Sequence, residues 1–281
     1  MLRATRPLAH GNIAPAILYG QALAFATTGR FSWTALAIAQ TFGVLDHLVI
    51  VFANDYADRD ADVLQTAPTP FSGGSRVLPD GELSPRTIHL AAIASAFALA
   101  LFCALARPAL VPLALISILL IGAYSFAPLR LSYRGGGELL QGLGIGVVLP
   151  LVGWVAQGAR LDARLALWLA PTFVLGVAGN VLTSIPDEEA DRSANKGSPA
   201  ALWGGRRARG ASMLLHAIGI ALGWALLPLG QASTIVGVLA ILPQVAARTR
   251  LDARSTLAFV IFGGLTETIA ILGWSLALLL R

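Results

Sequence analysis

Long apolar segments alternate with short polar ones along almost the whole chain. Nine apolar segments have about the length, roughly 17 to 25 residues, that crosses a bilayer as a helix: 12–28, 34–53, 87–106, 109–127, 138–157, 165–185, 211–229, 232–247 and 257–280. The first follows Arg3 and Arg6, as in a secretory signal, but eight more segments come after it, so we expect a retained helix. The pattern predicts an all-α polytopic membrane protein with nine transmembrane helices.

The distribution of charge predicts the orientation. Charged residues make up only 12% of the chain, against about a quarter in soluble domains. Cytoplasmic loops collect Arg and Lys, and a cytoplasmic N-terminus would leave only five of the 20 basic residues outside, namely Arg30, Arg107, Arg160, Arg164 and Arg281. We therefore expect that orientation. The net charge of +5 then reflects topology and contact with membrane lipids, so we expect no nucleic-acid partner.

Acidic residues concentrate in two segments, which follow the second and the sixth apolar spans. Six of the 15 acids lie between Asp55 and Glu82, and four lie between Asp187 and Asp191. One acid-rich loop is usually a solvated face, but two on the same predicted side favour a functional site. The arrangement indicates one membrane domain over residues 1–281 with a weak internal repeat, about 1–135 and about 136–281.

The first acidic segment has helical spacing. If the second helix continues past Phe52, then Asn54, Asp55, Asp58 and Asp62 are three or four residues apart and are expected to share one face. Like charges so placed repel one another, and a multivalent cation would reverse that cost. Carboxylate and amide oxygens suit Mg²⁺, which keeps several waters and shares its remaining positions with substrate phosphates. The segment therefore predicts a metal and diphosphate site.

The second segment repeats this pattern and adds a cation. Asp187 and Asp191 are four residues apart, and Lys196 is the only lysine in the sequence, placed where its ammonium could reach a phosphate oxygen. Three arginines beside glycine-rich stretches are further candidates for binding the diphosphate: Arg76, Arg130 and Arg134.

Polar residues inside the spans are costly and often functional. His47 lies seven residues before Asn54 on the same face, so it could line a cavity beneath the metals, whereas Asp46 is expected to face elsewhere, toward a buried partner. Asn180 shares a face with Asp187 and either extends the second site or bonds between helices. Internal pairing is the favoured interpretation for two further acids, Glu138 and Glu267.

These segments resemble the UbiA superfamily of intramembrane prenyltransferases over nearly the whole chain. The family motif N-D-x-x-D-x-x-x-D is matched by Asn54, Asp55, Asp58 and Asp62, and its D-x-x-x-D motif with a following lysine by Asp187, Asp191 and Lys196. "RPLAHGNIAP", "TPFSGGSRVLPDGELSP" and "YSFAPLRLSYRGGGELLQGLGIG" resemble the 1,4-dihydroxy-2-naphthoate polyprenyltransferase branch of menaquinone synthesis. Thr183 and Ser184 stand where that branch commonly has two asparagines.

The resemblance implies a nine-helix bundle around a central cavity in a prokaryotic cytoplasmic (inner) membrane, with the active site facing the cytoplasm. It implies that two Mg²⁺ ions bridge the diphosphate of an isoprenyl donor, one held by the first motif and one by the second. The prenyl group would pass to an aromatic acceptor. Catalytic roles are expected for Asp58, Asp62, Asp187 and Asp191, and substrate-binding roles for Asn54, Arg76, Arg130, Arg134, Lys196, His47 and Asn180.

Two alternatives remain open at the level of sequence. The same scaffold could prenylate another acceptor or cyclise the donor itself. A transporter is the alternative from another class, because repeats with acidic midpoints also suit alternating access. The acids cluster at span ends on one side, which favours an active site over a path through the membrane.

Overall fold

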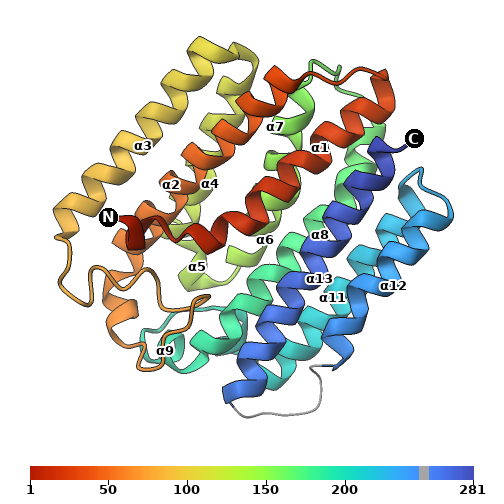
Figure 1. Ribbon diagram of the computed structural model, residues 1–281. Helices are drawn as coiled ribbons and strands as arrows, with labels where there is room; N and C mark the ends of the chain where they lie inside the picture. Colours follow the sequence, from red (N-terminus) through yellow and green to blue (C-terminus); the bar gives the residue numbers. More distant parts are fainter. Residues whose placement is uncertain (247–252) are drawn as a thin grey trace.

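The computed structural model describes residues 1–246 and 253–281, and these residues form a helical bundle (Figure 1). The long helices are α1 (Ile13–Thr28), α2 (Trp33–Val63), α3 (Pro85–Ala106), α4 (Val111–Ser125), α8 (Arg164–Ser184), α11 (Gly205–Leu226), α12 (Gln231–Ala246) and α13 (Ala253–Leu279). The short helices are α5 (Leu131–Arg134), α6 (Gly137–Leu143), α7 (Leu149–Ala156), α9 (Glu188–Ser193) and α10 (Pro199–Trp203). A π-helical turn, Gly144–Val148, joins α6 to α7.

Seven helical segments in the described part of the chain are long and apolar enough to cross a membrane. They are Trp33–Val63, Pro85–Ala106, Pro108–Ser125, Gly137–Ala156, Arg164–Ser193, Gly205–Leu226 and Thr256–Leu279. The other two predicted spans correspond to α1 and α12, which have 16 residues each. The chain is therefore an all-α polytopic membrane protein with about seven candidate spans. Arg248 and Arg250, assigned to the inside by sequence, lie outside the described residues.

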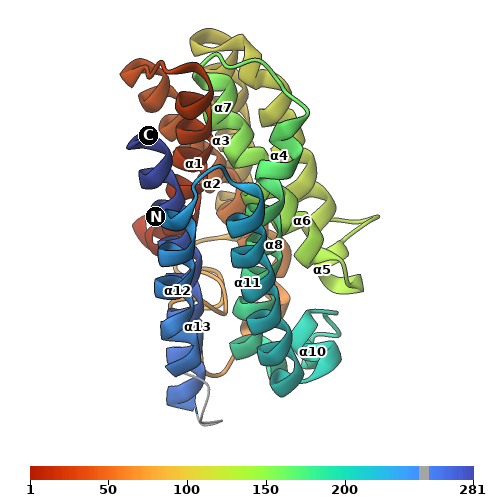
Figure 2. The ribbon, with the colours of Figure 1, turned by 90° about the vertical axis from the view of Figure 1, so that its right-hand side faces the viewer.

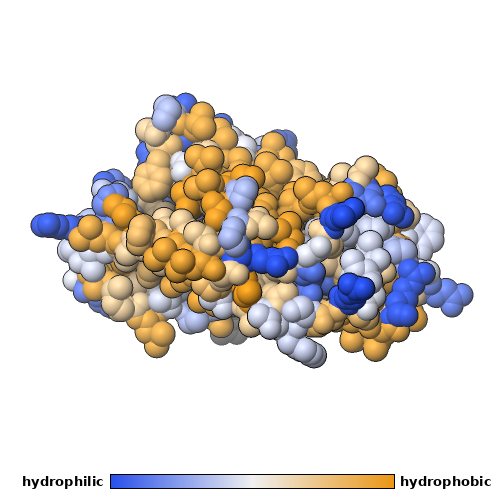
Figure 3. All heavy atoms as spheres, turned by 90° about the horizontal axis from the view of Figure 1, so that it is seen from above, coloured by the Kyte–Doolittle hydropathy of each residue, from blue (hydrophilic) through white to orange (hydrophobic). Residues whose placement is uncertain are grey.

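Apolar side chains cover the outside of the bundle as well as its core. On α3, for example, Leu90, Phe97 and Leu105 are exposed by 54%, 68% and 78%. Seen from the end that carries the α1–α2 connection, hydrophobic residues reach the outline of the molecule and hydrophilic ones form separate groups (Figure 3). Such a surface suits contact with lipid tails and would be unfavourable in water.

The helices pack in neighbouring sets that surround the centre of the molecule. α2 contacts α3 and α4, α8 contacts α6 and α11, and α1 lies against α7 and α13 (Figures 1 and 2). The backbones of α1 and α7 touch, because a Cβ atom at Gly20 would lie 1.8 Å from the carbonyl oxygen of Pro150. Close backbone approach at small residues is a common way of packing helices in membranes.

Helix α2 extends ten residues beyond the end predicted for its apolar span. The Ser32 side chain caps it by accepting from the Ala35 amide, as N-cap serines do. The first proline after the start of α2 is Pro68, beyond the end of the helix. No helix breaker therefore interrupts α2 at the first charged residues. The first acidic motif therefore continues the membrane helix without a break.

A buried polar network joins α8, α11, α12 and α13. His216 Nε2 lies 3.0 Å from Glu267 Oε1, and His216 Nδ1 lies 2.7 Å from the Ser212 carbonyl and 3.0 Å from Gln244 Nε2. The Ser212 hydroxyl lies 3.4 Å from the Ala178 carbonyl of α8. The internal pairing predicted for Glu267 is thus present.

Replacing Glu267 by leucine is expected to lower the free energy of unfolding by about 1–3 kcal/mol, because buried His216 loses a hydrogen-bond partner. Glu267→Gln keeps an acceptor at this place and should cost clearly less. Thermal and denaturant unfolding of the purified protein in detergent would measure both. Equal losses for the two variants would contradict a hydrogen-bonding role for Glu267.

Candidate active site

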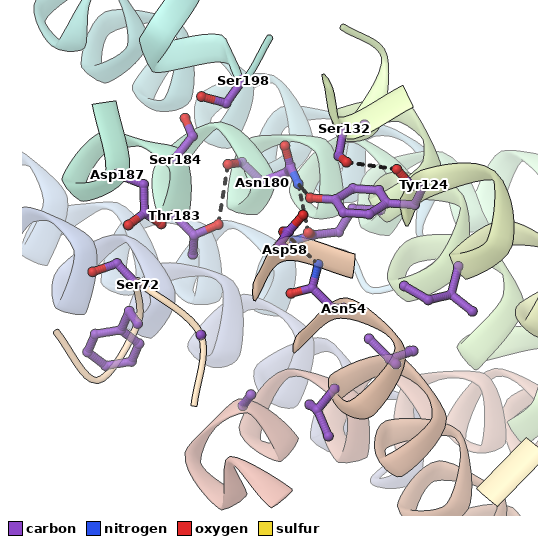
Figure 4. Close-up of a pocket in the computed structure, with 18 of the residues that line it drawn as sticks. Asn54, Asp58, Ser72, Tyr124, Ser132, Asn180, Thr183, Ser184, Asp187 and Ser198 are labelled. Atoms are coloured by element: carbon purple, nitrogen blue, oxygen red, sulfur yellow. Dashed lines mark hydrogen bonds between the residues drawn. The ribbon is translucent and has the colours of Figure 1, made fainter. Parts of the chain in front are cut away.

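A cavity of about 300 Å³ lies among α2, α4, α6 and α8. The sequence-predicted site residues that line it are His47, Asn54, Asp58, Asp62, Asn180, Asp187, Asp191 and Lys196. In Figure 4, Asn54 and Asn180 extend from different helices into this pocket, and Asp187 lies beside Thr183 and Ser184. Residues from the two acidic motifs, more than 120 positions apart in the sequence, thus line one cavity.

One ridge of α2 supplies the first motif. Asp46, Ile50, Asn54, Asp58 and Asp62 are four residues apart and all line the cavity. Asn54 Nδ2 donates to Asp58 Oδ2 at 3.0 Å, which fixes both side chains.

Asp55 lies at the edge of this face, rotated by only about 20° from Asp62 around the helix, but it does not line the cavity. It follows Asn54 directly and is therefore rotated from it by about 100° around the helix. Its carboxylate is buried, accepts from the Ser75 amide at 3.3 Å and lies 3.7 Å from Arg6 Nη1. Asp55 thus connects α2 to the 64–84 loop and to the N-terminal segment.

Lys196 connects the two motifs. Its Nζ lies 2.9 Å from Asp58 Oδ2 and 3.7 Å from Asp191 Oδ1, and its side chain is only 15% exposed. Burial acts to lower the pKa of Lys196, but the carboxylates of Asp58 and Asp191 outweigh burial and raise that pKa well above its usual value. A protonated amine therefore lies between the acidic motifs at neutral pH.

The loop at residues 64–84 closes over the same end of the cavity and is tied to the second motif. Gln65 Nε2 donates to Asp187 Oδ1 at 2.6 Å and to the Pro186 carbonyl at 3.2 Å. Gly74 has a φ of +66°, and a Cβ there would lie 2.2 Å from Asp62 Oδ2. Only glycine lets the loop backbone approach that carboxylate so closely.

The arginines predicted to bind substrate lie outside the cavity lining. Arg76 donates to the carbonyls of Asp62, at 2.5 Å, and Gln65, at 3.3 Å, so it caps the end of α2. Arg130 stacks over the Tyr133 ring at 3.5 Å and donates to the Ala57 carbonyl at 3.4 Å. Arg134 is exposed. Arg6, which the sequence reading treated as a topology signal, lines the cavity instead.

Polar residues continue from the motifs into the membrane part of the cavity. Asn180 Nδ2 donates to Gln141 Oε1 at 2.8 Å and to the Tyr124 hydroxyl at 3.3 Å, and His47 Nε2 donates to the Thr5 carbonyl at 2.6 Å. Asp46 has the buried partner expected for it, Ser117 at 2.5 Å. It also lines the cavity, which the sequence reading did not predict.

The motif residues fit a divalent cation that is completed by substrate and water. Asp55 Oδ2 and Asp58 Oδ1 are buried without a hydrogen-bond partner, which is costly unless a ligand satisfies them. In the described part of the chain, no three His, Cys, Asp or Glu side chains converge as a ready-made metal cage. Mg²⁺ does not need such a cage, since it commonly takes one or two carboxylates together with waters and substrate phosphates.

Comparison with known families agrees with this fold. The profile of the UbiA prenyltransferase family matches residues 12–262, and the chain belongs to this family of membrane-embedded enzymes. A comparison with curated protein sequences gives no significant match.

Solved structures of UbiA homologues share the fold. One from Archaeoglobus fulgidus bound to DMAPP and Mg²⁺ has a TM-score of 0.70 at 20% identity, covering 96% of this chain and 98% of its own. A UbiA homologue from the same organism bound to GPP and Mg²⁺ has a TM-score of 0.70 at 19% identity, covering 100% of this chain and 99% of its own. The apo structure of a UbiA homologue from Aeropyrum pernix K1 has a TM-score of 0.69 at 22% identity, covering 97% of this chain and 98% of its own.

Proposed function

We propose that this chain transfers a prenyl group from an isoprenyl diphosphate to an aromatic acceptor in a Mg²⁺-dependent reaction. The observation that carries the proposal is the meeting of both acidic motifs and Lys196 in one cavity whose middle is lined by apolar residues. Homologues of the same fold are bound to DMAPP or GPP with Mg²⁺, which supports an isoprenyl diphosphate as donor and Mg²⁺ as cofactor.

In the proposed reaction, the bond from the prenyl carbon to the diphosphate oxygen breaks, a bond to a ring carbon forms and the ring loses a proton. Asn54, Asp58 and Asp62 would hold one Mg²⁺, with Asp55 beside them, and Asp187 and Asp191 a second. The bound metal neutralises charge on the diphosphate. Lys196 and Arg6 add positive charge where the departing diphosphate develops negative charge. The apolar walls keep water from the allylic cation.

The other basic residues expected to bind substrate would mainly stabilise the protein structure around the site. Arg76 and Arg130 bind backbone carbonyls of α2, so we propose that they support substrate binding by holding the motif helix and the loop in place. Arg134 would meet the diphosphate only at the entrance. His47 and Asn180 would line the cavity beneath the diphosphate.

We further propose nine transmembrane helices, with α1 and α12 as the two short ones, and a cytoplasmic N-terminus. The excess of basic residues on that side supports this orientation. The motifs would then open to the cytoplasm from a prokaryotic inner membrane, and the two halves, about 1–135 and about 136–281, would each contribute one acidic motif to the shared cavity.

The acceptor we propose is 1,4-dihydroxy-2-naphthoate, as in menaquinone synthesis. Incubation of the purified protein with Mg²⁺, isoprenyl diphosphates and a panel of aromatic acids tests this, with products identified by mass. Prenylation of a different acid would overturn the acceptor and leave the reaction class intact. A cyclic hydrocarbon from donor alone would identify a cyclase. Solute uptake without diphosphate release would identify a transporter.

A further inference from the structure

The cavity has a second polar end, deep in the membrane part of the bundle. Asp46 on α2 is 1% exposed and accepts a hydrogen bond from the Ser117 hydroxyl of α4, which is 5% exposed. Both residues line the cavity. The Ser117 hydroxyl donates to Asp46 Oδ1 at 2.5 Å. Ionisable residues that face a cavity inside the membrane are rare and usually functional.

Apolar residues separate this deep end from the diphosphate end on each helix that reaches both. On α2, Ile50 and Val51 lie between Asn54 and the deep pair Asp46 and His47. On α4, Leu120 and Ile121 lie between Ser117 and Tyr124. The cavity is therefore apolar in its middle, and the tail of a donor whose diphosphate lies at Asp58 would occupy that middle and point toward Asp46.

The length of this apolar part follows from helix geometry. Asp46 and Asp58 are twelve residues apart in the uninterrupted α2, which corresponds to about 18 Å along the axis. The four chain bonds of an extended isoprene unit span roughly 4.7 Å, on the scale at which three backbone bonds span about 3.5 Å. Because the diphosphate and its metal take the first few ångströms, about two or three units fit. A cavity of about 300 Å³ is at the small end for ligand sites.

We infer that Asp46 and Ser117 close the deep end of the tail pocket and restrict the donor to about two or three isoprene units. A longer tail would press its methyl groups against the carboxylate and displace any water that satisfies Asp46 Oδ2. Leaving a buried polar atom unsatisfied is unfavourable, so geranylgeranyl diphosphate is used at least about tenfold less efficiently than geranyl diphosphate. This inference rests on the proposed function.

The test compares geranyl, farnesyl and geranylgeranyl diphosphates with the purified full-length protein and Mg²⁺. Asp46→Ala removes the polar floor and is expected to raise the ratio of kcat/KM for geranylgeranyl to geranyl diphosphate about tenfold. Mg²⁺-dependent thermal stabilisation by each diphosphate, without acceptor, should shift in the same direction and reports binding independently of turnover. Ser117→Ala gives a smaller shift and carries the test if Asp46→Ala does not fold.

Two matched variants distinguish an effect of side-chain polarity at the deep end from an effect of pocket volume. Asp46→Asn keeps a polar group of the same size and should leave the length preference as in the wild type. Leu120→Ala enlarges the apolar wall but keeps the polar floor, and should not favour the longer donor. If the wild type used all three donors equally, or if all variants showed the same shift in donor preference, this inference would be overturned. The proposed function would stand. Failure to bind any isoprenyl diphosphate would overturn the proposed function and this inference with it.

Discussion

Asp58→Asn is expected to lower the rate of Mg²⁺-dependent diphosphate release by at least about 100-fold. Asp58 combines two roles: Oδ1 is buried without a partner, and Oδ2 pairs with Lys196 at 2.9 Å. The asparagine has nearly the same shape but lacks the charge that binds the cation and orients the ammonium. Steady-state release of diphosphate from the donor, measured over a range of Mg²⁺ concentrations, gives the change.

Asp60→Asn is the matched control for this variant. Asp60 lies in the same turns of α2, but it is 86% exposed and does not line the cavity. Its rate should stay within about twofold of the wild type, since exposed charges contribute little. A comparable loss in both variants would point to a general effect of charge on α2, and an undiminished rate in Asp58→Asn would remove this residue from the site.

Lys196→Met is the second substitution with a large expected effect, a fall in kcat of about 100- to 1,000-fold. The variant removes the amine that lies between Asp58 and Asp191, and with it a positive charge that opposes the negative charge of the departing diphosphate. Lys196→Arg keeps the charge and should recover part of the rate but not all of it, because a planar guanidinium differs in size and geometry from the compact ammonium. Single-turnover release of diphosphate separates this step from product release.

Arg206→Met tests whether the loss of a basic side chain outside the cavity also lowers kcat. Arg206 is exposed and does not line the cavity, so its replacement should leave the rate unchanged within about twofold. If Lys196→Met and Arg206→Met change kcat equally, the contacts of Lys196 with the two acidic motifs have no role in the chemistry.

The parts of the site that sequence predicts well are those encoded locally. Asn54, Asp58 and Asp62 line the cavity because a spacing of four residues follows one ridge of a helix. The sequence does not settle whether α2 continues through this motif. The apolar pattern ends at Phe52, although nothing in the sequence stops the helix there.

The parts that sequence misses depend on contacts between distant segments. Arg76 lies beside two glycines and looked suited to a phosphate, but its guanidinium is already bonded to the Asp62 and Gln65 carbonyls. Arg6 lines the cavity because the N-terminal segment folds back against α2, and no local pattern signals that. Gln65 has an amide side chain within a polar loop, and its bond to Asp187 spans more than 120 positions.

The single lysine of the sequence offers a direct measure of whether the site is occupied. Besides the N-terminus, Lys196 is the only primary amine in the chain, so reagents that acylate amines have one internal target. Because its ammonium is buried and paired, we expect acylation to be slow in the resting protein and slower still with a bound diphosphate. The mass added at this one residue therefore reports ligand binding in a native membrane, without purification or turnover.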